Sequence, residues 1–469
     1  MRKATKNQWI FFSIVTLLYI AFVIWDGNYW LLLGIPVIFD IYISKIIPWG
    51  AWKKSENKAL RKVAEWVDAI VFALVAVYFI NIFIFQMYKI PSSSLEKTLL
   101  VGDYLVVNKF SYGPRVPNTP LSFPLVQHTF PIINTKSYIE WPKWGYKRLK
   151  GLGNVKRNDI VVFNFPAGDT VAINKQNPDY YFWVYMYGWD VVNSDKNAYG
   201  DIVYRPVDRR ENFVKRCIGL PGDSLQIIEN EIYIDGKHLP LAEKVQFVYY
   251  VETKGGFLTE KQFRTIGISS DDYANSIRNG LQNMENAFIM LGIQKNADGN
   301  YNPVYRLPLT QEAIQKFEKS GWIRSIHIEP DSFEYVNAYY PYGYETNWTR
   351  DNYGPIWIPK RGATVQLTPF NLALYTRCIV NYEGNSLEKK GDQLLINGSP
   401  ATEYTFKYDY YFMMGDNRHS SADSRSWGFV PEDHIVGRPV LIWFSTDKDR
   451  SLFNGGIRWN RLFRTVSAQ

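Results

Sequence analysis

Residues 66–108 read WVDAIVFALVAVYFINIFIFQMYKIPSSSLEKTLLVGDYLVVN, and this stretch decides the fold. Its first part, 66–87, is mainly apolar, carries no charge apart from Asp68 near its start and is long enough to cross a lipid bilayer as a helix. From residue 88 onward the chain changes to short runs that are rich in β-branched and aromatic residues. The stretch therefore predicts a membrane helix that leads, through a cluster of three serines, into a mainly-β domain.

Two further apolar segments precede this helix. The segment 9–25 carries no charge, and the segment 30–44 is shorter and contains a proline and an aspartate. We predict that 9–25, 30–44 and 66–87 all span the membrane, which makes residues 1–87 a membrane anchor. The alternative for 30–44 is a re-entrant or interfacial segment. Bulky residues rather than a small-x-small cleavage site follow the first apolar run, so we expect an uncleaved anchor.

The distribution of charge indicates an orientation in the membrane rather than a nucleic-acid partner. The formal net charge is +8, and half of this excess lies in residues 1–85, which hold nine basic and five acidic residues. Residues 86–469 hold 44 basic and 40 acidic residues, so no dense basic face is expected there. Basic residues precede residue 9 and recur across 45–65, whereas the link 26–29 has none. The positive-inside rule then places the N-terminus in the cytoplasm and the soluble part on the other side.

The soluble part shows short strand patterns with Asp-Gly and Asn-Gly turn signals at 103–110, 158–165, 223–239 and 392–401. A stretch within 270–320 differs, because its apolar residues recur at helical spacing. We therefore predict N-terminal transmembrane helices followed by a mainly-β domain with a large α+β insertion. The predicted divisions are the anchor 1–87, the first part of the β domain 88–240, the insertion 241–400, the last part of the β domain 401–450 and a C-terminal tail 451–469.

Metal and disulfide chemistry are not indicated by the sequence. Cys217 and Cys378 are far apart and form no C-x-x-C pattern, and the five histidines show no H-x-x-x-H spacing. The chain also has no G-x-S-x-G elbow and no G-x-x-x-x-G-K-[ST] phosphate loop. We therefore expect a protein without a metal ion or another cofactor.

Three polar blocks carry candidate chemistry. The first is the serine cluster behind Pro91, which can present a hydroxyl just outside the bilayer. The second is NFVKRCIGLPGD, 212–223, in which Lys215 acts as a base only if burial lowers the pKa of its ammonium from about 10.4 toward neutrality. The third is MGDNRHSSADSRSWGFVP, 414–431. Taken singly, each block has a simpler explanation: the first as a polar linker, the second as a strand with two exposed cations and the third as a surface loop.

Together, the blocks and their order resemble the bacterial type I signal peptidases, which are membrane-bound Ser–Lys endopeptidases. The motifs cover a minority of the chain, but the last two are long and specific, and an apolar anchor precedes the serine motif. The resemblance rests on IPSSSLEKTLLVGDYLVVNK at 90–109, NDIVVFNFP at 158–166, NFVKRCIGLPGD at 212–223, and MGDNRHSSADSRSWGFVPE followed by IVGRPVLIW at 414–443.

The resemblance implies a role for each matching polar residue. Ser94 is implied as the nucleophile and Lys215 as its general base, with an acyl-enzyme that water then hydrolyses. The backbone N–H of Ser94 and the hydroxyl of Ser92 are implied as the donors that hold the oxyanion. Ser421 matches the serine that orients the lysine ammonium.

The resemblance also implies structural support and substrate pockets. Asp423 and Arg425 match an ion pair that braces the site. The shallow apolar pockets that accept the small residues of the substrate are implied to be lined by Ile90, Leu95, Leu99 and Val214.

The implied activity is the removal of N-terminal signal peptides from exported precursor proteins, after small residues in an A-x-A pattern. The implied partners are these signal peptides, the lipid bilayer and, by proximity, the secretion translocon. We expect a multi-pass protein of the bacterial cytoplasmic (inner) membrane, with its catalytic domain on the periplasmic or outer face. The aromatic and basic stretch 141–148, WPKWGYKR, is typical of a segment at the membrane interface, although ordinary surface packing explains it equally well.

The chain departs from the family's pattern at two positions. Leu95 replaces the usual methionine, which conserves volume and apolarity. Lys97 replaces the usual proline and creates S-x-x-K with Ser94, the signature of penicillin-binding proteins and β-lactamases, whose K-[ST]-G motif is imitated at 319–321. A penicillin-binding acyl-enzyme that uses Ser94 and Lys97 is therefore one alternative. A non-catalytic envelope protein with a β domain is the other.

Overall fold

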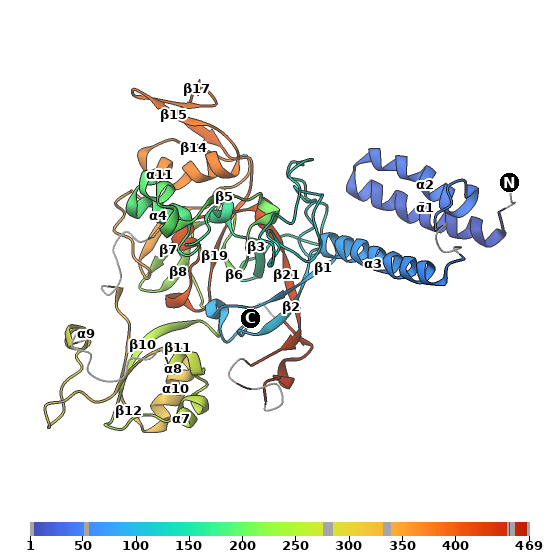
Figure 1. Ribbon diagram of the computed structural model, residues 1–469. Helices are drawn as coiled ribbons and strands as arrows, with labels where there is room; N and C mark the ends of the chain where they lie inside the picture. Colours follow the sequence, from blue (N-terminus) through green and yellow to red (C-terminus); the bar gives the residue numbers. More distant parts are fainter. Residues whose placement is uncertain are drawn as a thin grey trace. The chain divides into compact units, whose positions relative to one another are not determined.

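The chain divides into two compact units, of which the first combines Met1–Gln86 with Lys109–Gly153 and the second combines Met87–Asn108 with Asn154–Gln469. The first unit holds the predicted anchor, and the second holds the three polar blocks. Parts of the predicted cytoplasmic loop, of the predicted helical stretch and of the C-terminal tail lie outside the described residues. The computed structural model describes residues 4–50, 56–274, 285–331, 339–447, 450 and 455–466 (Figure 1).

Two long apolar helices dominate the first unit and are blue in Figure 1. Helix α1, Lys6–Asp26, begins at a capping box centred on Thr5 and ends at Gly27, which adopts the left-handed conformation. Helix α3, Lys58–Phe83, begins at Asn57, whose side chain accepts hydrogen bonds from two backbone N–H groups. Both helices are long and apolar enough to cross a membrane. They confirm the apolar N-terminal helices of the predicted fold.

The segment between these helices forms a shorter helical run. It consists of the 3₁₀ helix η1, Tyr29–Gly34, one turn of α-helix in α2, Ile35–Phe39, and a turn of π-helix in η2, Asp40–Ser44. The whole run is shorter than the roughly 20 residues that a spanning helix needs. The third predicted span therefore stays a prediction.

The excursion Lys109–Gly153 belongs to the first unit and contacts both long helices. The ring of Phe110 stacks on that of Trp25 with ring centroids 5.7 Å apart. The hydroxyl of Tyr78 in α3 donates a hydrogen bond to the carbonyl oxygen of Pro120. Many apolar side chains of the excursion are exposed, among them Leu121, Leu125, Ile132, Ile133, Ile139 and Trp141.

One large sheet organises the second unit. Its strands follow the order β1-β2-β21-β3-β6-β19-β20, and β22 pairs with β21. In β2 fully buried residues alternate with half-buried ones, as in a strand that lays one face on a core. The strand β21 comes from the end of the chain and lies between β2 and β3. The bounds are β1 Phe85–Lys89, β2 Asp103–Asn108, β3 Ile160–Asn164, β6 Asn212–Gly219, β19 Tyr410–Met414, β20 Val430–Pro431, β21 Ile435–Ser445 and β22 Arg464–Thr465.

The two predicted hairpins, 223–239 and 392–401, form parts of the sheets β13-β7-β8-β9 and β15-β16-β17. A further two-stranded sheet, β14-β18, was not predicted. The turns of the two hairpins use the Asp-Gly and Asn-Gly pairs at Asp235 and Asn397, where both residues of each pair have a positive φ. The bounds are β7 Ser224–Ile228, β8 Glu231–Ile234, β9 Lys237–Leu239, β13 Tyr353–Trp357, β14 Thr364–Gln366, β15 Leu387–Lys390, β16 Gln393–Ile396, β17 Ser399–Pro400 and β18 Glu403–Thr405.

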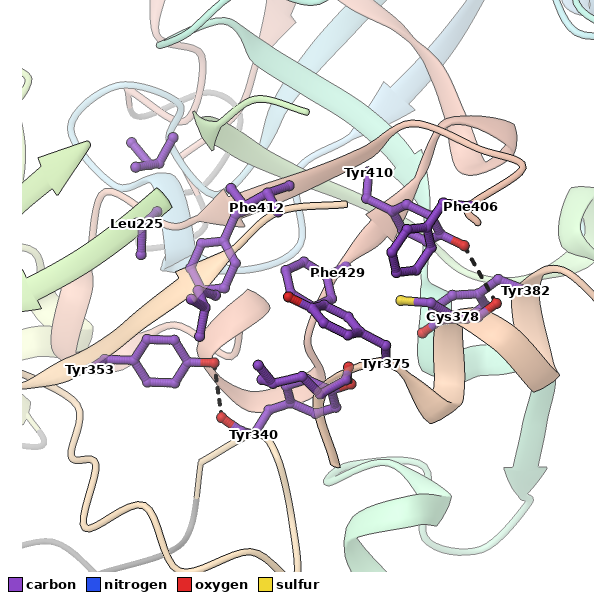
Figure 2. Close-up of a cluster of buried hydrophobic side chains, with 14 of the residues drawn as sticks. Leu225, Tyr340, Tyr353, Tyr375, Cys378, Tyr382, Phe406, Tyr410, Phe412 and Phe429 are labelled. Carbon is purple, nitrogen blue, oxygen red and sulfur yellow. Dashed lines mark hydrogen bonds between the residues drawn. The ribbon is translucent and has the colours of Figure 1, made fainter. Parts of the chain in front are cut away.

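An aromatic core connects these hairpins to strand β19 and to Phe429 (Figure 2). Tyr375 stacks on Phe429 with ring centroids 5.8 Å apart, and the hydroxyl of Tyr353 donates to the carbonyl oxygen of Tyr340 over 2.9 Å. This core mixes residues from 340–406 with residues of β6 and β19. Within the predicted insertion 241–400, the later part is therefore built into the β domain. The helices of this region are α11 Pro369–Arg377, η9 Cys378–Tyr382, η10 Arg418–Ser420, α12 Ser424–Trp427 and η11 Glu432–His434.

Residues 246–328 form a separate sheet with a core of its own, which we call the β10–β12 module. Its central strand β10, Gln246–Thr253, lies between β11, Val304–Thr310, and β12, Ile323–Ile328. Helix α10, Gln311–Ser320, buries its apolar face in this core, together with residues of α7 and of the strands. The module contains the helices predicted near 270–320, together with a strand that was not predicted there. The other helices are α7 Glu260–Ile266, α8 Ser270–Ala274 and α9 Glu285–Met290.

A small lobe with helices that the sequence analysis did not predict lies along the chain between β3 and β6. Its helix α4, Tyr180–Tyr187, consists of aromatic and β-branched residues with one methionine, a composition typical of strands, and is started by the cap Asp179. The other elements are β4 Thr170–Ala172, α5 Trp189–Ser194, α6 Lys196–Tyr199 and β5 Ile202–Tyr204.

Candidate active site

Ser94 lies in a single 3₁₀ turn, η4 Ser93–Leu95, on the connection between β1 and β2. The main-chain N–H of Ile90 donates to the carbonyl oxygen of Asp103 over 2.8 Å and so closes the base of this connection. Ser94 is buried, and its Oγ lies 3.5 Å from the Oγ of Ser92. The turn therefore holds two hydroxyl groups side by side, one of them on the predicted nucleophile.

Lys215 lies in β6, which is a neighbour of the Ser94 turn, and 4% of the residue is exposed. Val161 of β3 is its partner across the sheet, and its Nζ lies 5.9 Å from the ring centroid of Phe213. Burial lowers the pKa of the Lys215 ammonium to about 8, although the carboxylates of Asp423 and Asp416 act to raise it. A sizeable fraction of this lysine is therefore neutral at mildly alkaline pH, which is what a general base requires.

Gly415 lies where the Ser94 turn and the loop that carries Ser421 approach each other most closely. A Cβ atom at this position would lie 2.2 Å from the Oγ of Ser421 and 2.7 Å from the carbonyl oxygen of Ser94. Beside it, the main-chain N–H of Asn417 donates to the same carbonyl oxygen over 3.1 Å. Only a glycine allows the two loops to approach so closely. The structure thus brings the predicted residues Ser94 and Ser421 together.

Asp423 and Arg425 form the bidentate ion pair that the sequence predicts, with Nε–Oδ1 and Nη2–Oδ2 distances of 2.9 and 2.8 Å. Both side chains are buried, and Oδ2 of Asp423 also accepts a hydrogen bond from the N–H of Gly415. Burial acts to raise the pKa of the Asp423 carboxyl, but the Arg425 guanidinium holds it below its usual value. Burial is the largest influence on the pKa of Lys215 and lowers it; Asp423 acts to raise this pKa, and Arg425 acts to lower it.

A second buried ion pair was not predicted from the sequence. Arg216 donates from Nε and Nη2 to Oδ1 and Oδ2 of Asp416, with both distances 2.7 Å, and Thr98 Oγ1 donates to Asp416 Oδ2 over 2.7 Å. The pair therefore ties the strand of Lys215 to the 414–431 loop and to the residues that follow Ser94. The available signal was the position of Arg216 inside a strand and of Asp416 just after another strand. A charged side chain that is buried in a core requires a partner of opposite charge.

The predicted pocket residues lie in one apolar cluster. Ile90, Leu95 and Leu99 are buried, and the half-buried Val214 packs against them. The main-chain N–H of Leu99 donates to the carbonyl oxygen of Leu95 over 2.8 Å, which keeps both side chains on one turn. Their contact with a substrate stays a prediction.

Lys97 is engaged away from the serine cluster. Its Nζ donates to the carbonyl oxygen of Gly267 over 2.8 Å, at the C-terminal end of α7. The K-[ST]-G sequence at 319–321 forms the end of helix α10, where Gly321 is the C-cap in the left-handed conformation. A penicillin-binding fold needs its nucleophile at the start of a helix in a large α/β domain, whereas the Ser94 turn leads into β2 of a β sheet. The penicillin-binding alternative therefore has no support in the structure.

Metal ligands do not gather anywhere in the described part of the chain. Within residues 4–50, 56–274, 285–331, 339–447 and 455–466, no group of three His, Cys, Asp or Glu side chains is arranged to hold a metal ion. Cys217 and Cys378 are both buried and unbridged.

Comparison with known proteins assigns the family. A family profile described as signal peptidase, peptidase S26, matches residues 63–281 and 402–444, which include all three polar blocks. Signal peptidase I of Buchnera aphidicola subsp. Acyrthosiphon pisum is 25% identical over 412 residues, which are 87% of this chain and 83% of that protein. Signal peptidase I of Haemophilus influenzae is 23% identical over 422 residues, 88% of this chain and 79% of that protein.

These matches confirm the resemblance inferred from the sequence and the prediction of a serine endopeptidase, and they exclude the alternative of a non-catalytic envelope protein. The chain belongs to the signal peptidase family, peptidase S26.

Proposed function

We propose that this S26 peptidase removes signal peptides from exported precursors with Ser94 as the nucleophile and Lys215 as the general base. The observation that carries the proposal is the buried Lys215 ammonium with its lowered pKa, on the strand that neighbours the Ser94 turn. Lysine is usually charged at neutral pH, and burial of this kind is how a protein makes it a base. The activity of the family and the chemistry of these two side chains therefore agree.

In the proposed reaction, Oγ of Ser94 attacks the carbonyl carbon of the scissile peptide bond, and its proton moves to Nζ of Lys215. The resulting oxyanion accepts hydrogen bonds from the N–H of Ser94 and the hydroxyl of Ser92. The C–N bond then breaks, and Lys215 returns the proton to the leaving amine. Lys215 next takes a proton from a water molecule as the water oxygen attacks the ester carbonyl of acylated Ser94. The C–O bond to Ser94 then breaks, Lys215 returns the proton to Oγ of Ser94, and the signal peptide leaves with a free carboxyl group that ionises in water.

The proposed role of Ser421 is to hold the Lys215 ammonium in line with Ser94. Its Oγ borders Gly415, which is also in contact with the carbonyl oxygen of Ser94. The ion pair of Asp423 and Arg425 fixes the start of the same loop through the N–H of Gly415. These contacts indicate that the loop positions the reacting groups and does not itself take part in cleavage of the peptide bond.

The test is precursor cleavage by the full chain in membrane vesicles, with the variants Ser94→Ala, Lys215→Ala and Lys97→Ala. Ser94→Ala and Lys215→Ala are expected to lose cleavage by at least about a thousandfold, as removal of a nucleophile or its base does. Lys97→Ala is the matched lysine control and is expected to retain cleavage within a factor of about ten. Loss of cleavage in Lys97→Ala together with full activity of Lys215→Ala would overturn the assignment of the base.

We propose cleavage after small residues in an A-x-A pattern, with the cluster of Ile90, Leu95, Leu99 and Val214 as the floor of the pocket. The packing of these apolar side chains in one buried cluster supports this, because a large substrate residue would need to displace them. The test compares the cleavage of precursors that carry Ala, Ser, Leu or Phe directly before the cleavage site. Those with Ala or Ser are expected to be cleaved faster than those with Leu or Phe. Equal cleavage of the Ala and Phe precursors would contradict the proposed specificity.

We propose three membrane spans, with the N-terminus and the loop 45–65 in the cytoplasm and the catalytic domain on the outer face of the inner membrane. The basic flanks of α1 and α3 support this orientation. In the chain with Lys62→Cys or Lys319→Cys, a membrane-impermeant thiol reagent added outside is expected to label only the second variant. Labelling of Lys62→Cys from outside would show that 30–44 does not span.

We propose that the lipid bilayer also contacts the excursion Lys109–Gly153. Pro120 accepts a hydrogen bond from the hydroxyl of Tyr78 in α3. Tyr78 lies five residues before the C-terminal end of α3, which corresponds to about 7.5 Å along the apolar part of that helix. Ile132 is 91% exposed and Trp141 is 79% exposed. Basic side chains accompany them, and Lys147 bonds to the carbonyl oxygen at the end of α1.

The depth of this excursion can be measured with a fluorophore on Leu125→Cys in the full chain in nanodiscs that contain anionic lipid. Spin-labelled lipids are expected to quench it strongly, and a fluorophore on Lys319→Cys serves as the exposed control. Cys217 and Cys378 are buried and do not compete for the label. Equal quenching at both positions would contradict the lipid contact.

We propose that the catalytic domain comprises 88–240 and 401–450, that 241–400 is inserted between them with its later part packed into the same core, and that 451–469 is a tail whose strand β22 pairs with β21. We also propose that the enzyme works close to the secretion translocon. A substrate cleaved at the membrane surface during export supports the latter. Photo-crosslinking from position 132 during export is expected to capture translocon subunits, and a crosslink to lipid alone would contradict this proximity.

A further inference from the structure

The β10–β12 module contacts the loop that carries Ser421. The main-chain N–H of Gln246, at the start of β10, donates to the carbonyl oxygen of Asp416 over 2.9 Å, and Gln246 and Asn417 form a parallel β-bridge. Asn417 in turn donates to the carbonyl oxygen of Ser94. The first strand of the module is thus two main-chain hydrogen bonds away from the nucleophile.

His419 makes the second contact between the module and this loop. Its side chain is completely buried, and Nδ1 accepts a hydrogen bond from the N–H of Val248 in β10 over 3.2 Å. Because Nδ1 is an acceptor, the ring proton resides on Nε2, which lies 3.0 Å from Oδ1 of Asp351 and 3.3 Å from Oδ1 of Asn230. The ring is therefore held on both edges.

The module also contacts the other loop of the site. Lys97 lies three residues after Ser94, and its Nζ donates to the carbonyl oxygen of Gly267, where α7 ends. A cation at the C-terminal end of a helix is favourable, since the unpaired carbonyl groups there carry partial negative charge. Lys97 thus connects the Ser94 loop to the module.

A fourth connection leads from the end of β12 to the ion pair of Asp423 and Arg425. Glu329, one residue beyond β12, lies 3.2 Å from Nη1 of Arg350, and both side chains are buried. The carbonyl oxygen of Arg350 accepts a hydrogen bond from Nη1 of Arg425 over 3.2 Å. The end of the module is therefore linked to the partner of Asp423.

We propose that the β10–β12 module is a positioning element of the active site, and that His419 is the positioning residue through which it acts. The proposal rests on the roles proposed for Ser94 and Lys215. The module contacts the Ser94 loop and the Ser421 loop, and Glu329, the residue after β12, leads through Arg350 to Arg425. His419 connects β10 to the middle of the Ser421 loop. Loss of this connection leaves the substrate pocket intact and loosens the alignment of the nucleophile with its base.

The test compares His419→Leu with His419→Asn in the full chain, using a signal-peptide substrate. His419→Leu keeps the volume but loses both ring nitrogens, so the N–H of Val248 has no acceptor. We expect kcat to fall about 10- to 100-fold with KM within about twofold, because small misplacements of reacting groups have such effects on rate. His419→Asn is expected to recover most of kcat, since its side-chain oxygen replaces Nδ1 as the acceptor.

Lys97→Met removes the contact between the Ser94 loop and the end of α7 and is expected to lower kcat by a factor of about three to ten. Lys316→Ala changes an exposed side chain on α10 and serves as the control within the module, with no expected effect. Thermal unfolding of each variant separates positioning from folding: a merely structural role would lower the unfolding temperature and leave kcat per folded molecule unchanged.

The outcomes of the two proposals are distinguishable. If Ser94→Ala and Lys215→Ala abolish cleavage while His419→Leu cleaves at the wild-type kcat, the proposed function stands and the positioning role is wrong. An increase in KM alone would overturn positioning in favour of substrate binding. If Lys215→Ala retains cleavage, the proposed function fails, and the positioning proposal fails with it.

Discussion

The main-chain N–H of Asn417 donates a hydrogen bond to the carbonyl oxygen of Ser94 over 3.1 Å. Two parts of the chain that are more than 300 residues apart in sequence are thus joined through their backbones, so no side-chain substitution removes this bond directly. The side chains around it decide whether it can form. Gly415 is the first of these, because the loop passes the Ser94 turn at this residue.

Gly415→Ala is expected to lower the cleavage rate by at least about tenfold. The added methyl group would lie 2.2 Å from Ser421 Oγ and 2.7 Å from the carbonyl oxygen of Ser94, so one loop must move away from the other. Gly145→Ala is the matched control, since no atom lies within 4 Å of its added methyl group. Equal rates for the two variants in a precursor cleavage assay would contradict the close approach.

The cleavage rate is expected to rise with pH as Lys215 loses its proton. With a pKa of about 8 for its ammonium, kcat/KM should increase about tenfold per pH unit below pH 7 and level off above pH 9. The measurement is the pH profile of single-turnover acylation, with Lys97→Ala as a control that keeps the profile. A rate that stays constant from pH 6 to 10 would rule out a lysine base.

Lys215→Met is expected to be inactive and more stable than the wild type at neutral pH. The pKa of Lys215 is about 8 in the folded chain and 10.5 in an ordinary setting, so the folded state binds this proton less tightly than the unfolded state. The resulting cost, about 3 kcal/mol, is present below pH 8 and disappears as the pH rises to about 10.5.

Chemical denaturation of the two proteins at pH 7 and pH 10.5 measures this difference in the free energy of unfolding. The variant should gain stability at pH 7 and lose that advantage at pH 10.5. If the variant is less stable than the wild type at pH 7, burial of the Lys215 ammonium does not lower the free energy of unfolding, and the prediction is wrong.

Asp416→Asn is expected to destabilise the second unit by about 3–5 kcal/mol. The change leaves the Arg216 guanidinium buried without its carboxylate, and a broken buried ion pair costs far more than the intact pair contributes. Glu388→Gln removes a charge from an exposed pair with Lys390 and should change stability by less than about 1 kcal/mol. Similar unfolding midpoints for the two variants would contradict a fully buried Arg216–Asp416 pair.

Much of the architecture could be predicted from local patterns. The apolar helices, the strands at 103–110 and 158–165, and the hairpins with Asp-Gly and Asn-Gly turns depend on residues that are close in sequence. The helix Tyr180–Tyr187 was missed because its residues favour strands, and the cap Asp179 with tertiary packing overrides that preference.

The candidate site could be predicted only where the family motif or local chemistry is explicit. The motif register identified Ser94, Lys215 and Ser421, and the structure brings their elements together. The Arg216–Asp416 pair and the His419 contacts were not predicted, since each joins residues that are distant in sequence and depends on strand register. The contact of Lys97 with Gly267 depends on the placement of the β10–β12 module, which no local pattern contains.

The position of β21 has a consequence for the newly made protein. This strand, Ile435–Ser445, separates the hairpin that carries Ser94 from the strands β3 and β6, and β6 carries Lys215. A chain is synthesised from its N-terminus, so the serine and the lysine emerge long before the strand that connects their parts of the sheet. A nascent chain therefore holds both side chains without a shared scaffold, and the proposed pairing of Ser94 with Lys215 becomes possible only once β21 has been added.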